Sequence, residues 1–420
     1  MHKSDNEHTR GALTLPVTAV AARRPVAGAA GGNALITVSP ATRYGTQRPG
    51  PLAGHLLAVK DLITVAGMPT TMGSRFFDPT PSSSTAPVVS RLERAGAAVI
   101  GKANLDEYAW GVTGENVNWG RIINPDSPEL IAGGSSGGTA AAIASGMATI
   151  GLGTDTAGSV RIPAACCRVV GLRPRTGTLP NEGVQGLSPS FDVVGPMAAT
   201  VSDCALVWQV LSGEQPQHVP DLSELRLGVA PDVIGLEPLL AIRAQLTPLP
   251  VPIGVLDPFW TVMRAEAFAT HRKQLADDPE SFSPALRAKL NAAAAIHPAE
   301  VPGARGILER YRSRMLHDLD DYDAWLLPVL GRSIPEAGVD EARIRDALGW
   351  PSALVSALDL PSLALGGLQI VARTEGHALA VGERVAQVLG EHPAVAFTKD
   401  PRPRFHIAPT GASTRREVNP

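Results

Sequence analysis

The sequence is poor in cysteine, in aromatic residues and in charge of either sign. Three cysteines in 420 residues, two of them adjacent, exclude a disulfide framework and are typical of cytosolic thiols. Lys and Arg number 37 against 40 Asp and Glu, so no basic excess indicates a nucleic-acid partner and no acidic excess indicates a cationic one. Charged residues at 18% and apolar residues at 44% nevertheless exclude a disordered chain.

The sequence also lacks a clear targeting or membrane segment. The mildly apolar run from Gly11 to Ala22 is followed, not preceded, by its basic residues Arg23 and Arg24, which is the wrong order for a signal peptide. Leu130–Thr154 has 25 residues without a charge, but seven of them are glycine, so its transfer into lipid would be weak. We therefore expect a cytoplasmic protein without a membrane partner, and a buried site lined by backbone in this run.

Glycine and proline are abundant, with 42 and 37 residues, which indicates many turns. Between these turns, apolar runs predict strands at Leu56–Val59 and Ala148–Gly153, and periodicity predicts helices at Gly138–Thr149 and Val201–Leu211. Thr200 is placed to cap the last of these helices. Strands that alternate with helices predict an α/β fold whose sheet is covered on both faces.

Three segments carry residues suited to catalysis. Lys60 ends an apolar strand, Gly133–Gly138 reads Gly-Gly-Ser-Ser-Gly-Gly, and Gly153–Arg161 reads Gly-Thr-Asp-Thr-Ala-Gly-Ser-Val-Arg. Each has an ordinary structural interpretation on its own: a solvated strand-end charge, a linker, and a helix cap. Together they suit a site in which glycines expose backbone N–H groups to an oxyanion and a desolvated lysine acts as a base.

These segments resemble the amidase signature family. The resemblance is dense over residues 51–213 and is carried by an ordered series of motifs: Ala58-Val-Lys-Asp61, Gly67-Met-Pro-Thr-Thr71, Leu92 to Asn104, Glu107, Asn116, Asn124-Pro125, the two glycine-rich segments, Val170-Gly-Leu-Arg-Pro174 and Asp192 to Met197. It implies a large mixed, twisted β-sheet covered by α-helices on both faces, in a single domain over 34–397 with a divergent half at 217–397. The segment 1–33 is expected to be irregular, and the tail 398–420 disordered.

The resemblance implies a Ser–Ser–Lys triad in which the bridging serine follows a cis peptide bond. By position, Lys60 is the base, Ser135 is the bridging serine and Ser159 is the nucleophile. Ser159 would attack an amide carbonyl, form an acyl-enzyme and pass its proton through Ser135 to a neutral Lys60. Neither a metal nor a cofactor is needed, and the ten histidines, among which only His55 lies near the motifs, show no metal-ligand spacing.

The resemblance also implies residues around the triad. The oxyanion would be held by the backbone N–H groups of Thr156, Ala157, Gly158 and Ser159. Ser136, Asp155 and Arg161 are expected to support the triad. Tyr108 and Trp110 are expected either to line the substrate pocket or to pack in the core. The sequence departs from the usual motif at Ala157, where most members have glycine, and a homodimer is common in the family.

Several functions remain open on these residues. The leading hypothesis is hydrolysis of a linear carboxamide or an aryl amide, and passage of the acyl group to an amine is its variant. A second hypothesis is an α/β-hydrolase with Ser136 as nucleophile, since Gly134–Gly138 fits G-x-S-x-G, although Leu130–Ala132 is short for the strand that this requires. A third is a non-catalytic partner subunit that keeps the fold, suggested by the divergent second half.

Overall fold

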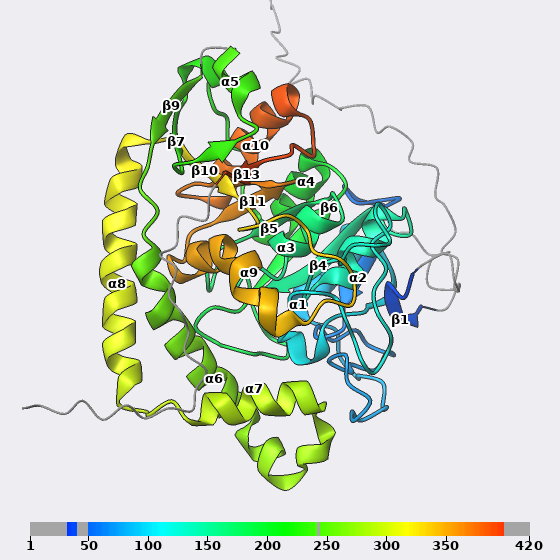
Figure 1. Cartoon of the computed structure of the whole chain (residues 1–420). Coiled ribbons are helices and arrows are strands. Elements are labelled where there is room, and N and C mark those ends of the chain that lie inside the picture. Colours follow the sequence, from blue (N-terminus) through cyan, green and yellow to red (C-terminus); the bar gives the residue numbers. More distant parts are fainter. Residues whose placement is uncertain (1–31, 40–48, 242–243, 399–420) are drawn as a thin grey trace, which may run out of the picture.

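The structure, a computed structural model, describes residues 32–39, 49–241 and 244–398 (Figure 1). Almost all of the segment expected to be irregular (1–33) and of the tail expected to be disordered (398–420) lies outside the described residues. Within them, no helix combines the length and the apolarity that a membrane crossing needs. The uncharged run Leu130–Thr154 forms a loop, a short helix and a buried strand instead.

Eleven strands form one mixed sheet in the order β1-β3-β2-β4-β6-β5-β11-β12-β10-β7-β9. Their bounds are β1 Leu35–Val38, β2 Leu56–Lys60, β3 Ala98–Ala103, β4 Ile150–Asp155, β5 Val170–Arg173, β6 Val193–Ala198, β7 Arg226–Val229, β9 Gln245–Pro248, β10 Ala324–Pro328, β11 Ser362–Leu365 and β12 Leu368–Val371. A separate pair joins β8 (Val233–Ile234) to β13 (Ala396–Phe397). The large sheet contains both parallel and antiparallel neighbours, which confirms the expected mixed α/β fold.

Helices cover both faces of the sheet. Among the described residues they are α1 Pro87–Arg94, α2 Gly137–Ala144, α3 Arg161–Cys166, α4 Val201–Ser212, α5 Glu237–Ala241, α6 Leu256–Asp277, α7 Pro284–Ala294, α8 Glu300–Asp318, α9 Glu341–Ala357 and α10 Glu375–Leu389. Helices α1, α4 and α10 pack over one face, and α2 and α3 over the other. In Figure 1, α6 and α8 run side by side along one flank of the molecule, with α7 at their lower end.

The alternation along β2 assigns its side chains to the two faces. Leu57 and Val59 join the core under α1, α4 and α10, whereas Leu56 and Ala58 join the core under α2. Because successive side chains of a strand point to opposite faces, Lys60 lies on the α2 side. The strand is buried on both faces, as its continuous apolar run requires.

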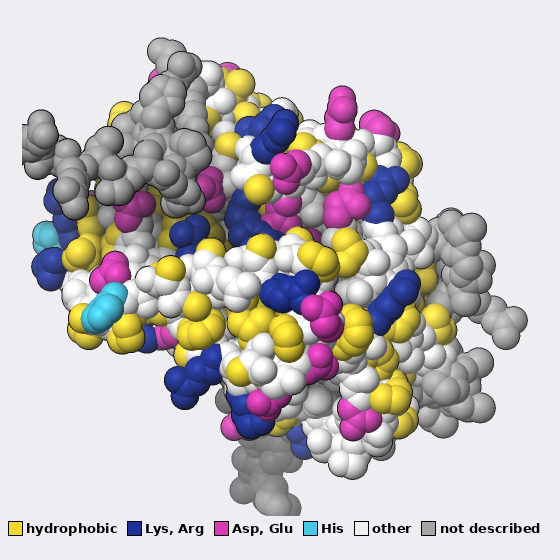
Figure 2. Space-filling model, turned by 60° about the horizontal axis from the view of Figure 1, so that its bottom comes forward, with side chains coloured by type: hydrophobic (Ala, Val, Ile, Leu, Met, Phe, Trp, Pro, Cys, Tyr) yellow, Lys and Arg dark blue, Asp and Glu magenta, His cyan; other side chains and the backbone are white. Residues whose placement is uncertain are grey.

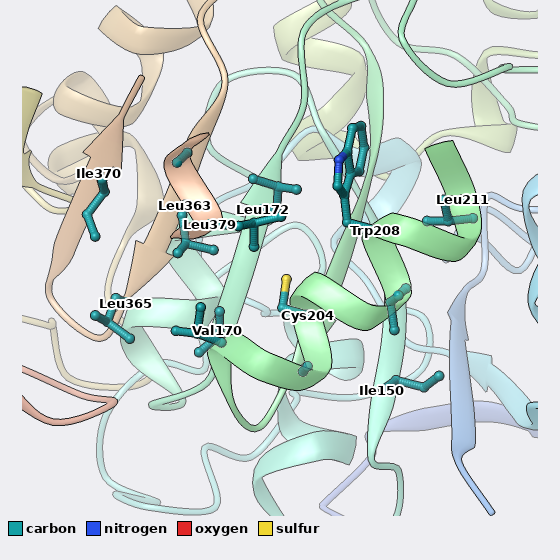
Figure 3. Close-up of a cluster of buried hydrophobic side chains, with 14 of the residues drawn as sticks. Ile150, Val170, Leu172, Cys204, Trp208, Leu211, Leu363, Leu365, Ile370 and Leu379 are labelled. Atoms are coloured by element: carbon teal, nitrogen blue, oxygen red, sulfur yellow. The ribbon is translucent and has the colours of Figure 1, made fainter. Parts of the chain in front are cut away.

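The core on the α4 side is formed by strand and helix side chains that interdigitate (Figure 3). Val170 and Leu172 of β5 face Cys204 and Trp208 of α4, and all four are almost completely buried. Burial of a valine or leucine side chain such as Val170 or Leu172 stabilises the folded state by roughly 1.5–3 kcal/mol. This packing holds β5 and β4, and therefore the loops that leave them, in fixed positions.

Most predicted elements are present, with some differences at the ends. Helix α4 begins at its predicted cap, where Thr200 Oγ1 accepts a hydrogen bond from Asp203 N at 3.1 Å. The helix predicted over Gly138–Thr149 ends earlier, at Ala144, because Gly146 has a left-handed φ of 73° that terminates it.

Helices α7 and α9 were not predicted from the sequence. Helix α9 contains Pro351, a residue that normally interrupts a helix because it lacks an N–H group. Its second half, from Leu348 onward, is buried, and the helix packs against α3 and α6. Tertiary packing therefore stabilises a helix that its local sequence disfavours.

One face of the molecule carries mixed charge (Figure 2). On the face drawn in Figure 2, Lys and Arg side chains are interspersed with Asp and Glu, and apolar groups lie scattered between them. The described residues also include exposed ion pairs such as Lys273–Asp277 and Arg343–Asp340. Among the described residues of this face, no field of one sign extends over the surface.

Candidate active site

Lys60 is the central residue of the candidate site. It is fully buried at the end of β2, and its Nζ donates to Ser135 Oγ at 2.8 Å. It also donates to Thr154 Oγ1 at 2.8 Å and to the Thr154 carbonyl at 3.3 Å. Because β2 and β4 pair in parallel, their carboxyl ends meet at one edge of the sheet, which brings Lys60 and Thr154 together.

The environment of Lys60 favours the neutral amine. Burial lowers the pKa of Lys60 to about 7, even though the negative charges of Asp106, Asp155 and Asp192 act in the opposite direction. Desolvation is the dominant cause, since an ammonium ion loses its hydration when it is buried. At neutral pH, a large fraction of Lys60 is therefore able to accept a proton.

The loop that carries Ser135 needs its glycines. Gly133 has a φ of 73°, and the peptide bond between Gly134 and Ser135 is cis, as the family resemblance implies. A β-carbon at Gly133 would lie 2.9 Å from Cys166 Sγ, and one at Gly134 would lie 1.8 Å from Asp106 Oδ2. Only glycine fits at these two positions, and the glycines let the loop enter the buried end of α2.

Ser136 holds this loop to β4. Its Oγ donates to the Thr154 carbonyl at 3.2 Å and accepts from Thr154 N at 3.3 Å, and its backbone N–H donates to the Ser159 carbonyl at 3.1 Å. These bonds tie the Ser135 loop to the loop that carries Ser159. Because the hydroxyl of Ser136 is occupied by backbone groups, its geometry suits the expected supporting role rather than that of a nucleophile.

The loop from Thr156 to Ser159 contains the expected oxyanion donors. One of them differs from expectation: the N–H of Gly158 donates to Asp155 Oδ1 at 2.8 Å. In the described part of the chain, the N–H groups of Thr156, Ala157 and Ser159 donate to no other residue. Ser159 itself is 7% exposed. Three backbone N–H groups beside Ser159 thus have no acceptor among the described residues.

Asp155 is the anchor of this loop. Arg161 binds its carboxylate with Nε–Oδ2 at 3.0 Å and Nη2–Oδ1 at 2.9 Å, and Arg173 Nη1 lies 3.2 Å from Oδ1. Burial alone would raise the pKa of Asp155, but the two guanidinium groups outweigh it and hold that pKa well below its ordinary value. Arg161 is held in turn by Ser356 Oγ of α9 and Gln369 Oε1 of β12.

A buried carboxylate behind the oxyanion loop was given no role from the sequence. Asp192 Oδ1 accepts from Thr156 Oγ1 at 2.6 Å, and Oδ2 accepts from the backbone N–H groups of Leu187 and Ser188. Burial raises the pKa of Asp192 to about 6. Composition and periodicity do not distinguish Asp192 from other aspartates. The only sequence feature that could have identified it is its position at the start of a family motif.

Tyr108 and Trp110 are packed in the core. The Tyr108 hydroxyl accepts from Gln274 Nε2 at 2.7 Å, and its ring lies 5.0 Å from that of Phe282. The Trp110 side chain is buried, and its backbone carbonyl accepts from Lys289 Nζ at 2.6 Å. Both side chains therefore have packed neighbours, and a role in lining the substrate pocket stays a prediction.

The adjacent cysteines Cys166 and Cys167 lie near the Ser135 loop and are buried. Burial raises the pKa of the Cys166 thiol to about 12 and that of Cys167 well above its ordinary value, so neither is a thiolate at neutral pH. Within the described ranges, no three His, Cys, Asp or Glu side chains are grouped as metal ligands would be.

Comparison with known proteins points to one family. The family model described as Amidase matches residues 31–233. The A subunit of glutamyl-tRNA(Gln) amidotransferase from Salinibacter ruber is 44% identical over 195 residues, which are 45% of this chain and 37% of that protein. The same subunit of Symbiobacterium thermophilum is 43% identical over 208 residues, covering 46% and 43%. The chain thus matches less than half the length of these curated relatives.

Solved structures match over a longer stretch. A crystal structure of an amidase superposes with a TM-score of 0.77 at 33% identity, covering 85% of this chain and 92% of that one. The A subunit of glutamyl-tRNA(Gln) amidotransferase from Thermotoga maritima superposes with a TM-score of 0.73 at 26% identity, covering 83% and 86%. Motifs, fold and these similarities agree, and the chain belongs to the amidase signature family.

Proposed function

We propose that this protein is an amidohydrolase that cleaves the C–N bond of a small carboxamide through an acyl-enzyme on Ser159. The observation that carries the proposal is the 2.8 Å hydrogen bond from Lys60 Nζ to Ser135 Oγ in a fully buried site. A lysine whose pKa is about 7 is suited to general-base catalysis at neutral pH. Membership of the amidase signature family supports the same reaction.

The proposed reaction begins with proton transfer along the relay. Neutral Lys60 accepts the proton of Ser135 Oγ, which accepts the proton of Ser159 Oγ as that oxygen attacks the amide carbonyl carbon. The carbonyl oxygen becomes an oxyanion, and the free N–H groups of Thr156, Ala157 and Ser159 bind it. The relay then returns a proton to the amide nitrogen, the C–N bond breaks, and ammonia or an amine leaves.

Water completes the proposed cycle. The relay takes a proton from water as its oxygen attacks the acyl carbon, and it returns that proton to Ser159 Oγ as the ester bond breaks. The products are a carboxylic acid and free Ser159, and Lys60 is neutral again. No metal or cofactor takes part in these steps, which need only the lysine, the two serines and backbone donors.

Transfer of the acyl group to an amine is the second candidate function. It is favoured by the curated relatives, which are named as amidotransferase subunits. The two reactions share the acyl-enzyme and differ in the nucleophile that attacks it. The third hypothesis, a non-catalytic partner subunit, is disfavoured by the assembled contact between Lys60 and Ser135, which such a subunit has no need to retain.

Covalent labelling tests the proposal without knowledge of the natural substrate. A fluorophosphonate should modify Ser159, located by intact mass and peptide mapping, and the modification should be lost in Ser159→Ala. Ser136→Ala is the matched control, because it removes a hydroxyl of the same site, and it should still be labelled at Ser159. Label on Ser136 with Ser159 untouched would favour the α/β-hydrolase hypothesis instead.

A panel of small amides tests turnover itself. Ammonia or amine release should be seen with wild type and should be lost in Ser159→Ala. Hydroxylamine added to the reaction distinguishes the two candidate functions, because a transferase should form the hydroxamate in preference to the acid. A folded wild type that neither reacts with the fluorophosphonate nor turns over any amide would support the non-catalytic subunit.

A further inference from the structure

Asp106 lies against the loop that carries Ser135, in a space left by glycines. A β-carbon at Gly134 would lie 1.8 Å from Asp106 Oδ2, and one at Gly111 would lie 2.2 Å from Oδ1. The N–H of Gly114 donates to both carboxylate oxygens, at 3.2 and 3.1 Å, and Thr113 Oγ1 lies 3.4 Å from Oδ1. Asp106 is thus buried and enclosed by the backbone that precedes Ser135.

This carboxylate has no ion-pair partner within the described residues. The charged groups that face it come from three elements: Lys60 of β2, Lys289 of α7 and Glu341 of α9. Lys289 is held at the site by the Trp110 carbonyl at 2.6 Å and by Glu341 Oε1 at 3.2 Å. Burial and the negative charge of Glu341 raise the pKa of Asp106 to about 7, and Lys289 and Lys60 oppose that shift.

Asp106 lies against Gly134, and the next residue, Ser135, binds Lys60 Nζ through its Oγ at 2.8 Å, so the two charged groups meet at the same loop. Their coupling acts in both directions. The charge of Asp106 raises the pKa of Lys60, and the charge of Lys60 lowers that of Asp106. Two other carboxylates face Lys60. Asp155 is neutralised by its two arginines, whereas Asp192 is bound by a hydroxyl and two backbone N–H groups. The pKa of Asp192 is also raised, to about 6, but its carboxylate contacts Thr156, Leu187 and Ser188. The carboxylate that lies against the Ser135 loop is Asp106.

We propose that Asp106 is a positioning residue, which supports the Gly134–Ser135 loop and whose negative charge controls how strongly Lys60 retains its proton. The inference rests on the proposed function, because it concerns the base of that reaction. When Asp106 is ionised, Lys60 holds its proton more tightly, and a smaller fraction of Lys60 is neutral and able to accept a proton from Ser135. When Asp106 is protonated, Lys60 gives up its proton at lower pH. The two groups therefore titrate as a coupled pair.

Asp106→Asn tests the proposal, because the amide removes the charge and keeps one oxygen as an acceptor for Gly114 N–H. The probe is phenylmethanesulfonyl fluoride, and the measurement is its rate of reaction with Ser159 as a function of pH, read by intact mass. We expect the ascending limb of this profile to move to lower pH by about one unit. Asp126→Asn, which removes an exposed carboxylate, is the matched control and should leave the limb in place.

Lys289→Gln is the second variant, because its side chain is partly exposed and the substitution keeps a donor for the Trp110 carbonyl. Loss of this positive charge leaves Asp106 protonated to higher pH, so the limb should again move to lower pH. A direct effect on Lys60 has the opposite sign, since removing a nearby positive charge raises the pKa of a lysine. The shift should also vanish when Asp106→Asn is already present.

The outcomes separate the two proposals. A folded Asp106→Asn protein that reacts more slowly at every pH, with its limb unmoved, shows a purely structural Asp106 and overturns the inference alone. A shift of Lys289→Gln to higher pH also overturns it, even if Asp106→Asn does not fold. If the wild type is not modified at Ser159 at any pH, the proposed function fails and the inference fails with it.

Discussion

Lys60 and Lys102 are buried lysines on adjacent parallel strands, and only Lys102 has a carboxylate against its ammonium group. Lys102 Nζ lies 2.6 Å from Asp61 Oδ1, whereas Lys60 contacts the hydroxyls of Ser135 and Thr154 and a carbonyl. Asp61 follows Lys60 directly but points to the opposite face of the sheet, where it meets Lys102. One lysine is thus part of a buried ion pair, and the other lies beside two hydroxyls, where the proposed reaction uses it as a base.

The first prediction concerns the pH dependence of the reaction. Lys60 has to be neutral to accept a proton, and its pKa is about 7, so kcat/KM should rise with pH through a midpoint near that value. Lys60→Met keeps most of the side-chain volume and should lose about 10²-fold or more in rate, the usual contribution of a general base. A pH–rate profile with circular dichroism as the folding control checks both. A folded variant with the same rate and limb would identify another base.

The second prediction links Lys60 to stability. The pKa of Lys60 is about 7 in the folded state against an ordinary value of 10.5, so between these values the unfolded chain binds one proton more. The free energy of unfolding should therefore rise with pH between 7 and 10.5, by about 1.4 kcal/mol per unit, and should lose this contribution progressively as the pH falls from 10.5 to 7. Urea unfolding of wild type and Lys60→Met isolates it as a difference. If that difference does not change with pH, folding does not lower the pKa of Lys60.

A third prediction uses neighbouring positions of the oxyanion loop. Gly158 has a φ of 119°, and a β-carbon there would lie 2.4 Å from Ser352 Cβ. Gly158→Ala should therefore destabilise the protein by about 1–3 kcal/mol and slow the labelling of Ser159 strongly. Ala157→Gly is the matched control and should stay within a few-fold of wild type. Equal effects of the two changes, measured by thermal unfolding and labelling, would contradict this account of the loop.

The fourth prediction is that no histidine takes part. His55 lies at the start of β2, at the opposite end of the strand from Lys60, and its Nδ1 contacts Thr149 Oγ1 at 3.1 Å. Turnover of His55→Gln should stay within a few-fold of wild type, because the relay contains no imidazole. The assay is the initial rate with any amide that the wild type cleaves. A loss as large as that of Lys60→Met would refute the Ser–Ser–Lys assignment.

The last prediction concerns the buried ion pairs of Asp155. Asp155→Asn leaves Arg161 and Arg173 without a counter-charge in the core, which should cost about 3–5 kcal/mol of folding free energy. The matched surface change, Asp126→Asn, removes a 3.7 Å contact with the exposed Arg168 and should cost less than about 1 kcal/mol. Denaturant unfolding of both variants gives the comparison. Similar losses would show that Asp155 does not organise the site.

The pattern along the chain was sufficient for the local parts of the site. An apolar run ending in Lys60 predicts a buried strand with a lysine at its end, because strand periodicity and burial are properties of a few neighbouring residues. The glycines around Ser135 likewise indicated a loop that approaches its neighbours closely. The order of the motifs identified the family, and with it the mixed sheet covered by helices on both faces.

The contacts that complete the site depend on the order of strands in the sheet. Arg161 meets Gln369 across 208 positions of sequence, and Lys289 reaches Trp110 across 179. No local pattern encodes such distant contacts, because they form only when β5 pairs with β11 and the helices pack above. For the same reason the sequence left the role of Tyr108 open and gave none to Asp106. Local sequence placed the lysine and the serines, and tertiary packing decided which charges surround them.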